Sequence, residues 1–373
     1  MKIKYKVLLL LLMSMFLLVA IWIILNSKEN ATYEYSLEEK AILLQPSPDG
    51  QFYITTTKES GFYQLSVWHV AQNKKVGEFN SRSKSLGSVE WSSDSKHFLF
   101  SSQDSSLFLF DINQANVESV WDTGNSKQFS PDEENVTVVD GKQLVVIDLK
   151  TLEPVSQIQF QGQRPHKVVG WSEDGIPRYV IGSQEEQGHA LMDITEDSGV
   201  SLIENNLAGN THYISSSVAV NNHESIYFRD SELRLYEFNL QSEDITRKTN
   251  HPVSLVSLSP DGTKVGSYNN GVNVFNLDDD LEEEYSQLKS ESYLKLWEWL
   301  NNNEFITVER RVKFAGFLGE SYHTEIHDIS TGEKKMSMRI PKPLMDNVYW
   351  AEKAQQIFIQ TEDRELYVYD IEH

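Results

Sequence analysis

Three groups of residues in this 373-residue sequence have types and spacings that could do chemistry. His323 and His327 are four residues apart, a spacing that suits a metal ion when the residues lie on a helix. The acidic run at 278–284 clusters carboxylates, and oxygen ligands attract calcium. Basic and aromatic residues, which are common at the centres of protein interfaces, follow closely on one another at Arg310, Arg311, Lys313, Phe314 and Phe317.

The first two groups are poor metal sites. The histidines fall in a stretch with a strand pattern, where four residues span about 13 Å, too far for one ion to bridge. The acidic run lacks the alternating ligand spacing and the glycine of a calcium loop. A solvated acidic loop is favoured for it. The start of a short exposed helix, with Leu281, Tyr285 and Leu288 as the apolar stripe, is the alternative.

Common catalytic motifs are absent from the sequence. It contains no Gly-x-Ser-x-Gly elbow, phosphate loop, dinucleotide fingerprint or His-Glu-x-x-His pair. The lack of cysteine excludes disulfides, thiolate metal sites, a cysteine nucleophile and a lipoprotein anchor, and it fits an exported bacterial protein. The sequence therefore predicts no catalytic residue, no metal and no cofactor.

Two short elements recur along the chain after residue 31. One is an apolar strand that ends in Asp or a substitute, at 67–70, 109–112, 146–149, 191–194, 237–240, 274–277, 326–329 and 368–371. The other is a Ser-x-Asp turn that precedes it, at 47–50, 92–94, 130–132, 172–175 and 259–262, with degenerate copies at 221–223, 301–303 and 351–353. The alternating residues after each turn predict strands, four to a unit.

These units resemble the blades of WD-repeat-like β-propellers of the TolB type, whose blades carry a Ser-Pro-Asp-Gly turn. The resemblance covers nearly everything after residue 31, although the Gly-His and Trp-Asp marks of true WD repeats are missing. It implies an all-β fold with a single propeller of eight four-stranded blades, or seven as the alternative. It implies no particular activity, because propellers host many unrelated functions.

The two ends of the repeat region complement each other. The last copy ends after its third strand, and a spare strand at 32–37 precedes the first copy. We expect the spare strand to complete the last blade, because closing the ring in this way hides a sheet edge.

A hydrophobic segment precedes the propeller. Residues 7–25 are apolar apart from Ser14, which is long enough to cross a bilayer, and Lys2, Lys4 and Lys6 favour a cytoplasmic N-terminus. Because the cleavage signal is poor, an uncleaved signal-anchor is favoured over a signal peptide. The predicted organisation is a cytoplasmic tail at 1–6, a single transmembrane helix at 7–25, a linker at 26–31 and an extracytoplasmic propeller at 32–373 in the cell membrane.

Two functions from different classes fit this organisation. The favoured one is a non-catalytic binding or scaffold module for a protein or polymeric partner. The alternative is a lactonase- or hydrolase-like enzyme with a site in the central channel, for which no converging set of histidines and carboxylates is recognisable. A net charge of −22 argues against nucleic acid as a partner.

Strand alternation assigns the predicted binding residues to one face of the propeller. The Ser-x-Asp turns join first and second strands and share one face, named the turn face. The loops between second and third strands share the opposite face, named the loop face, which includes Arg310 to Phe317. Further basic and histidine residues are expected there, at Arg82, Lys84, Arg164, His166, His212 and His251. We therefore predict a protein or polyanionic partner on the loop face, away from the membrane.

Overall fold

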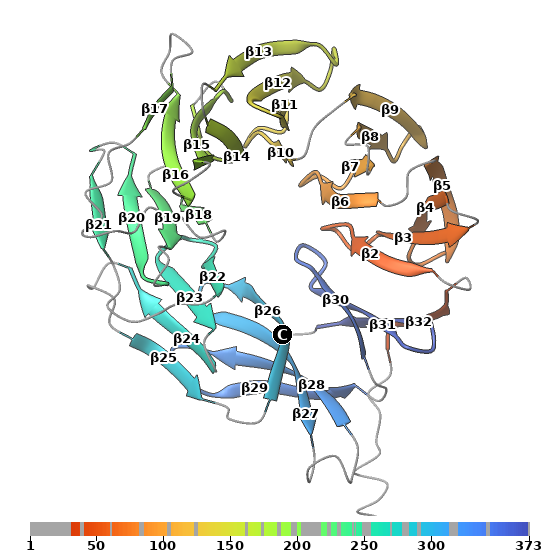
Figure 1. Ribbon diagram of the computed structural model, residues 1–373. Coiled ribbons are helices and arrows are strands. Elements are labelled where there is room, and N and C mark those ends of the chain that lie inside the picture. Colours follow the sequence, from red (N-terminus) through yellow and green to blue (C-terminus); the bar gives the residue numbers. More distant parts are fainter. Residues whose placement is uncertain are drawn as a thin grey trace, which may run out of the picture.

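The computed structural model is a single β-propeller of eight four-stranded antiparallel sheets arranged in a ring (Figure 1). The eight-blade prediction is confirmed, and the seven-blade alternative is wrong. The structure describes residues 31–37, 41–59, 62–81, 86–102, 106–122, 126–160, 163–172, 175–184, 188–194, 200–202, 218–221, 225–229, 233–240, 242, 244–247, 255–268, 271–277, 283–288, 292–312, 320–340 and 344–371.

The strands of blades 1 to 4 are given from the axis outward. Blades 1 and 2 contain β2 (Ile42–Pro46), β3 (Phe52–Glu59), β4 (Phe62–His69), β5 (Lys74–Ser81), β6 (Leu86–Trp91), β7 (His97–Ser102), β8 (Leu107–Asp111) and β9 (Asn116–Trp121). Blades 3 and 4 contain β10 (Ser126–Phe129), β11 (Asn135–Asp140), β12 (Gln143–Asp148), β13 (Pro154–Gln159), β14 (Gln163–Trp171), β15 (Pro177–Gln184), β16 (Gly188–Ile194) and β17 (Val200–Leu202).

Blades 5 to 8 follow the same order, except that the outermost strand of blade 8 comes from the start of the chain. Blades 5 and 6 contain β18 (Val218–Asn221), β19 (Ser225–Arg229), β20 (Leu235–Asn239), β21 (Ile245–Arg247), β22 (Leu255–Leu258), β23 (Lys264–Tyr268), β24 (Gly271–Asn276) and β25 (Glu283–Leu288). Blades 7 and 8 contain β26 (Ser292–Asn301), β27 (Glu304–Val312), β28 (Glu320–Asp328), β29 (Lys334–Ile340), β30 (Leu344–Ala351), β31 (Gln356–Thr361), β32 (Glu365–Asp370) and β1 (Tyr33–Ser36).

The Ser-x-Asp turns join first and second strands, as predicted. In blade 1 the Ser47 hydroxyl lies 2.6 Å from Asp49 Oδ1 and accepts the Phe52 amide at 3.0 Å. Gly50 ends the turn with a φ of 66°, which glycine adopts without strain. A Cβ atom on Gly50 would also lie 2.6 Å from Cβ of Ala354 in the turn of blade 8, so a larger residue would require a shift between these two turns.

Neighbouring blades pack through apolar side chains and are also linked by their turns. Trp299 lies in a buried cluster with Val272 and Val274 of the preceding blade and donates its indole N–H to the Ser257 carbonyl at 3.4 Å. Trp299 therefore fills the space between blades 6 and 7. On the turn face, the Asp49 amide donates to Ser95 Oγ of the next blade at 3.1 Å.

The ring closes as predicted. β1 pairs antiparallel with β32, with Tyr33 opposite Val368 and Ser36 opposite Glu365. Thr32 Oγ1 donates to Asp370 Oδ2 at 2.8 Å, and the Asp370 amide donates back to Thr32 Oγ1 at 3.1 Å. Asp370 ends β32 beside Gln356, which follows the turn of blade 8. The chain therefore enters the ring from the turn face.

The structure corrects the helical alternative for the acidic run. Glu283 to Leu288 form β25, which pairs with β24 as the outermost strand of blade 6. Residues 278–282 lie outside the described part of the chain. Each blade needs a fourth strand, so the tertiary pairing with β24 outweighs the local helical pattern of Leu281, Tyr285 and Leu288.

Candidate functional site

Two of the five predicted binding residues are described, and they lie at the loop-face end of blade 7, where β27 pairs with β28. Arg310 and Arg311 are near the end of β27, opposite Tyr322 and Ser321 of β28. Arg310 is half-buried. Lys313, Phe314 and Phe317 lie outside the described residues, as do Arg82, Lys84, His212 and His251 among the other predicted loop-face residues.

The two histidines of blade 7 are on a strand, as the sequence predicts. Both belong to β28, where His323 lies opposite Glu309 and His327 opposite Phe305. His327 is buried, its ring stacks on Phe305 with centroids 4.9 Å apart, and its Nε2 lies 3.6 Å from Glu325 Oε2. Among the described residues, no group of three or more His, Asp or Glu side chains has a geometry that would hold a metal ion.

Blade 7 also holds charged groups that the sequence analysis missed. Among the side chains that the structure describes, the buried acidic and histidine residues all lie on β27 and β28; they are Glu304, Glu309, Glu325, His327 and Asp328. Lys334 Nζ pairs with Glu325 Oε1 at 2.6 Å, and Lys335 Nζ pairs with both Glu304 Oε1 and Asp328 Oδ2. The alternation of charged residues at 323, 325 and 327 looks like a solvated strand face, so sequence alone gives no signal of burial.

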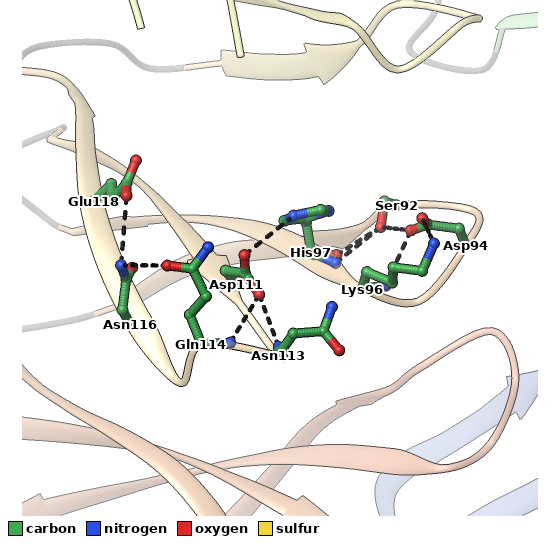
Figure 2. Close-up of polar contacts among 9 residues, drawn as sticks. All are labelled: Ser92, Asp94, Lys96, His97, Asp111, Asn113, Gln114, Asn116 and Glu118. Carbon is green, nitrogen blue, oxygen red and sulfur yellow. Dashed lines mark hydrogen bonds and ion pairs between the residues drawn. The ribbon is translucent and has the colours of Figure 1, made fainter. Parts of the chain in front are cut away.

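A cavity of about 550 Å³ lies between blades 2 and 3 on the turn face. Its floor includes Leu109 and Phe129, and its rim carries carboxylates together with His97 and Lys150. Around it, Ser92, His97 and Asp111 of blade 2 lie near one another, as Figure 2 shows. These are the residue types of a serine hydrolase triad, so their geometry tests the enzymatic alternative directly.

The geometry is not that of a triad. The Ser92 hydroxyl lies 2.8 Å from Asp94 Oδ1 and bonds the backbone of His97, not its imidazole ring (Figure 2). His97 Nε2 is 3.7 Å from Asp111 Oδ2, beyond a normal hydrogen bond. The same serine-to-aspartate contact occurs in blades 1, 3 and 6, where Phe52, Asn135 and Lys264 take the place of His97. Ser92 is therefore a turn residue.

The recurring aspartates at strand ends also serve local structure. Asp111 Oδ1 accepts the amides of Asn113 and Gln114 at 2.7 and 3.1 Å (Figure 2). Asp148 binds the amides of Lys150 and Thr151 in the same way. These carboxylates therefore stabilise turns. In Asp94, partial burial alone would raise the pKa, but hydrogen bonds from Lys96 and Ser92 lower it to about 2.

The innermost strands place several ionisable groups around the axis. Glu90 of β6 accepts the Phe129 amide at 3.2 Å, and burial raises its pKa. Lys127 of β10 reaches back to Ser88 and Ser101 of blade 2, and burial lowers its pKa to about 8. Glu298 of β26 keeps solvent contact, yet partial enclosure of its carboxyl group and the nearby Glu352 raise its pKa to about 7.

Comparisons with known proteins identify the fold. No model of a protein family matches the sequence, and no curated protein matches it. Among solved structures, the chain is similar to the β-propeller domain of Cps50 (Swd1) from Myceliophteria thermophila. The TM-score is 0.50 at 11% identity, and the match covers 92% of this chain and all of that one. At this identity the likeness shows the fold alone, a WD-repeat-like β-propeller.

The raised pKa of Glu298 predicts how its replacement changes stability. Between pH 4.5 and about 7 the folded protein holds this proton more tightly than the unfolded chain, so the free energy of unfolding falls as pH rises. Because the side chain is solvated, we expect the effect to be no more than about 1 kcal/mol. Glu298→Gln should raise Tm by ~1–2 °C at pH 8 and leave it unchanged at pH 5, as measured by calorimetry.

Glu362→Gln, which removes an exposed carboxylate from the β31–β32 turn, is the control. It should produce no such difference between the two pH values. Equal effects of Glu298→Gln at pH 5 and pH 8 would contradict the assigned environment of Glu298.

Proposed function

We propose that this protein is a non-catalytic binding module, held outside the cytoplasm by an uncleaved transmembrane helix at 7–25, with the loop face as its working surface. Residues 7–25 lie outside the described part of the chain. Within that part, no helix is both long enough and apolar enough to span a bilayer. Support for the anchor is therefore the apolar length of 7–25 and the lysines before it.

The observation that carries the orientation is the place where the chain enters the ring. Thr32 bonds Asp370 at the turn face, so the preceding residues leave from that face. Only residues 26–31 separate Thr32 from the predicted anchor, a reach of about 20 Å when fully extended. The turn face would then lie close to the bilayer, and the loop face would point away from it.

The chemistry of the loop face supports a protein or polyanionic partner. The sequence places Arg310, Arg311 and Lys313 there, beside Phe314 and Phe317, in a chain whose net charge is −22. Exposed apolar residues add to this face on blade 1. Ile42 and Phe62 begin β2 and β4 at its loop-face end and are 39% and 50% exposed. Arginine and aromatic residues supply much of the binding energy at interfaces.

The hydrolase alternative has no comparable support. The one Ser, His and Asp grouping described above is bonded as a turn, and Glu90 and Lys127 of the innermost strands bind backbone or neighbouring side chains. The TolB-type resemblance stays a prediction from the turn sequences and adds no activity.

The anchor predicts the mass of the mature protein. Protein extracted from membranes with detergent should retain residues 7–25, because the segment lacks a good cleavage site. Intact mass spectrometry measures this directly. A mature N-terminus beyond residue 25 would show that the segment is a signal peptide and that the propeller is released.

The working surface predicts which substitutions abolish binding. Replacing Arg310, Arg311, Lys313, Phe314 and Phe317 with Ser should reduce recovery of the crosslinked partner from native membranes at least roughly tenfold, since these are hot-spot residue types. The matched control replaces Lys96, Lys150 and Val155, which lie toward the turn face, with Ser and should leave recovery unchanged. Unchanged recovery with the first variant, in a normally folded protein, would remove the loop-face hairpin from consideration.

A further inference from the structure

Buried charge is concentrated in the blade that carries the predicted binding loop. The face of blade 7 toward blade 8 is apolar, with Ile306, Val308 and Ile326 packed against Ile357 and Ile359. By strand alternation Glu304 and Asp328 share this face at its turn-face end, whereas Glu309, Glu325 and His327 lie on the opposite face of β27 and β28. Burying charge costs free energy that apolar residues would not cost, so such groups are retained where they specify one arrangement over another.

The charges at the turn-face end of the hairpin form a clamp, which consists of Glu304, Asp328 and Lys335. Glu304 lies directly opposite Asp328 in the pairing of β27 with β28, and like charges opposite each other are destabilising. Lys335 of β29 removes this conflict by binding both carboxylates. The Ser330 hydroxyl and the Lys335 ammonium hold the pKa of Asp328 well below its usual range.

Glu304 is the member of the clamp whose position depends on the pairing of β27 with β28. Asp328 and Lys335 are fixed to each other by the short connection between β28 and β29, where the Thr331 amide donates to Asp328 Oδ1 at 3.1 Å. Glu304 belongs to β27, and Asn301 Nδ2 donates to its Oε2 at 2.5 Å. The contact between Glu304 and Lys335 therefore forms only when β27 and β28 pair in the observed register.

Apart from the stacking of Phe305 on His327 and the contact of Thr307 with His327, neither the alternation of apolar residues nor a tight turn opposes a slip of the described strands by two residues. Such a slip keeps the same side chains on each face, so the apolar pattern does not oppose it. A tight turn would fix the register, but β27 and β28 are joined by residues 313–319, not by a two-residue turn. A two-residue slip would move Glu304 about 7 Å from its place opposite Asp328 and out of reach of Lys335.

We propose that Lys335, held between Glu304 and Asp328, is a positioning residue that fixes the register of the β27–β28 hairpin and thereby the position of Arg310 and Arg311 at its loop-face end. The importance of this placement for binding rests on the proposed function. The register itself does not, because it is a property of the folded chain alone.

The absence of cysteine makes the register directly measurable. A disulfide requires Cβ atoms about 4 Å apart, so only residues that face each other crosslink efficiently. Val312→Cys with Glu320→Cys reports the observed register, in which these residues are paired. Val312→Cys with Tyr322→Cys reports a slip by two in one direction, and Arg310→Cys with Glu320→Cys reports a slip in the other.

With Lys335 present, oxidation should crosslink the first pair and leave the slipped pairs largely unlinked. Adding Lys335→Met should raise the yield of a slipped pair roughly tenfold, because Glu304 then faces Asp328 without a cation between them. Lys335→Arg should preserve the original pattern. Lys96→Met, which removes the exposed pair with Asp94 in blade 2, is the matched control and should also leave the pattern unchanged.

Unchanged yields after Lys335→Met, or an equal rise after Lys96→Met, would overturn the proposal. If Lys335→Met does not fold, a triple variant removes the repulsion between the two carboxylates as well as the clamp. It combines Glu304→Gln, Asp328→Asn and Lys335→Met. That variant should fold and still crosslink in a slipped register, and retention of the single observed register would overturn the proposal. The disulfide yields are measured without a partner. A wrong register proposal is therefore distinguishable from a wrong binding proposal, which is tested by partner recovery with the loop-face variant.

Discussion

Radial sheets can stack into a closed ring only if the last blade has a complete set of strands, and this chain meets that condition by pairing β1 with β32. The pairing joins residues from opposite ends of the sequence. The reciprocal bonds between Thr32 and Asp370 hold the two strands together at the turn face. Without β1, β32 would be an open edge that could pair with another chain. The same pairing brings residue 32 into the ring at the turn face, which is the observation that the proposed orientation uses.

The turn face and the loop face of the ring differ in how their connections are built. On the turn face, serine and aspartate side chains are occupied in turns, and bonds such as that from Asp49 to Ser95 link one blade to the next. Polar groups committed to the same bonds in several blades are poor candidates for chemistry, even where Ser92, His97 and Asp111 occur together. Most connections on the loop face lie outside the described residues, and among those between second and third strands the connection of blade 7, residues 313–319, contains the most residues. Function in a propeller depends on such departures from the repeat.

The sequence predicts the structure correctly where the local preference of a segment agrees with the pairing that the propeller requires of it. The Ser-x-Asp turns and the alternation after them gave eight blades, and the spare strand at 32–37 gave the closure. Local pattern failed where tertiary pairing decided the outcome, as in β25, whose acidic residues resemble a loop or helix until blade 6 requires a fourth strand. It also failed at Glu325 and His327, because alternating charged residues on a strand look solvated, and only the packing of blades shows that they are buried. The partners of Lys335 could not be predicted, since they depend on a cross-strand register that the sequence does not encode locally.

Ring closure is the claim that the rest depends on, and a cysteine pair at Ser36 and Glu365 tests it most directly. These residues face each other across β1 and β32 and are 329 positions apart in a chain that has no other cysteine. The account predicts that mild oxidation of Ser36→Cys with Glu365→Cys gives an intramolecular disulfide in the monomer, while the mismatched pair Glu34→Cys with Glu365→Cys gives little. A disulfide that forms only between chains, or equal yields from the two pairs, would contradict closure of blade 8 by β1.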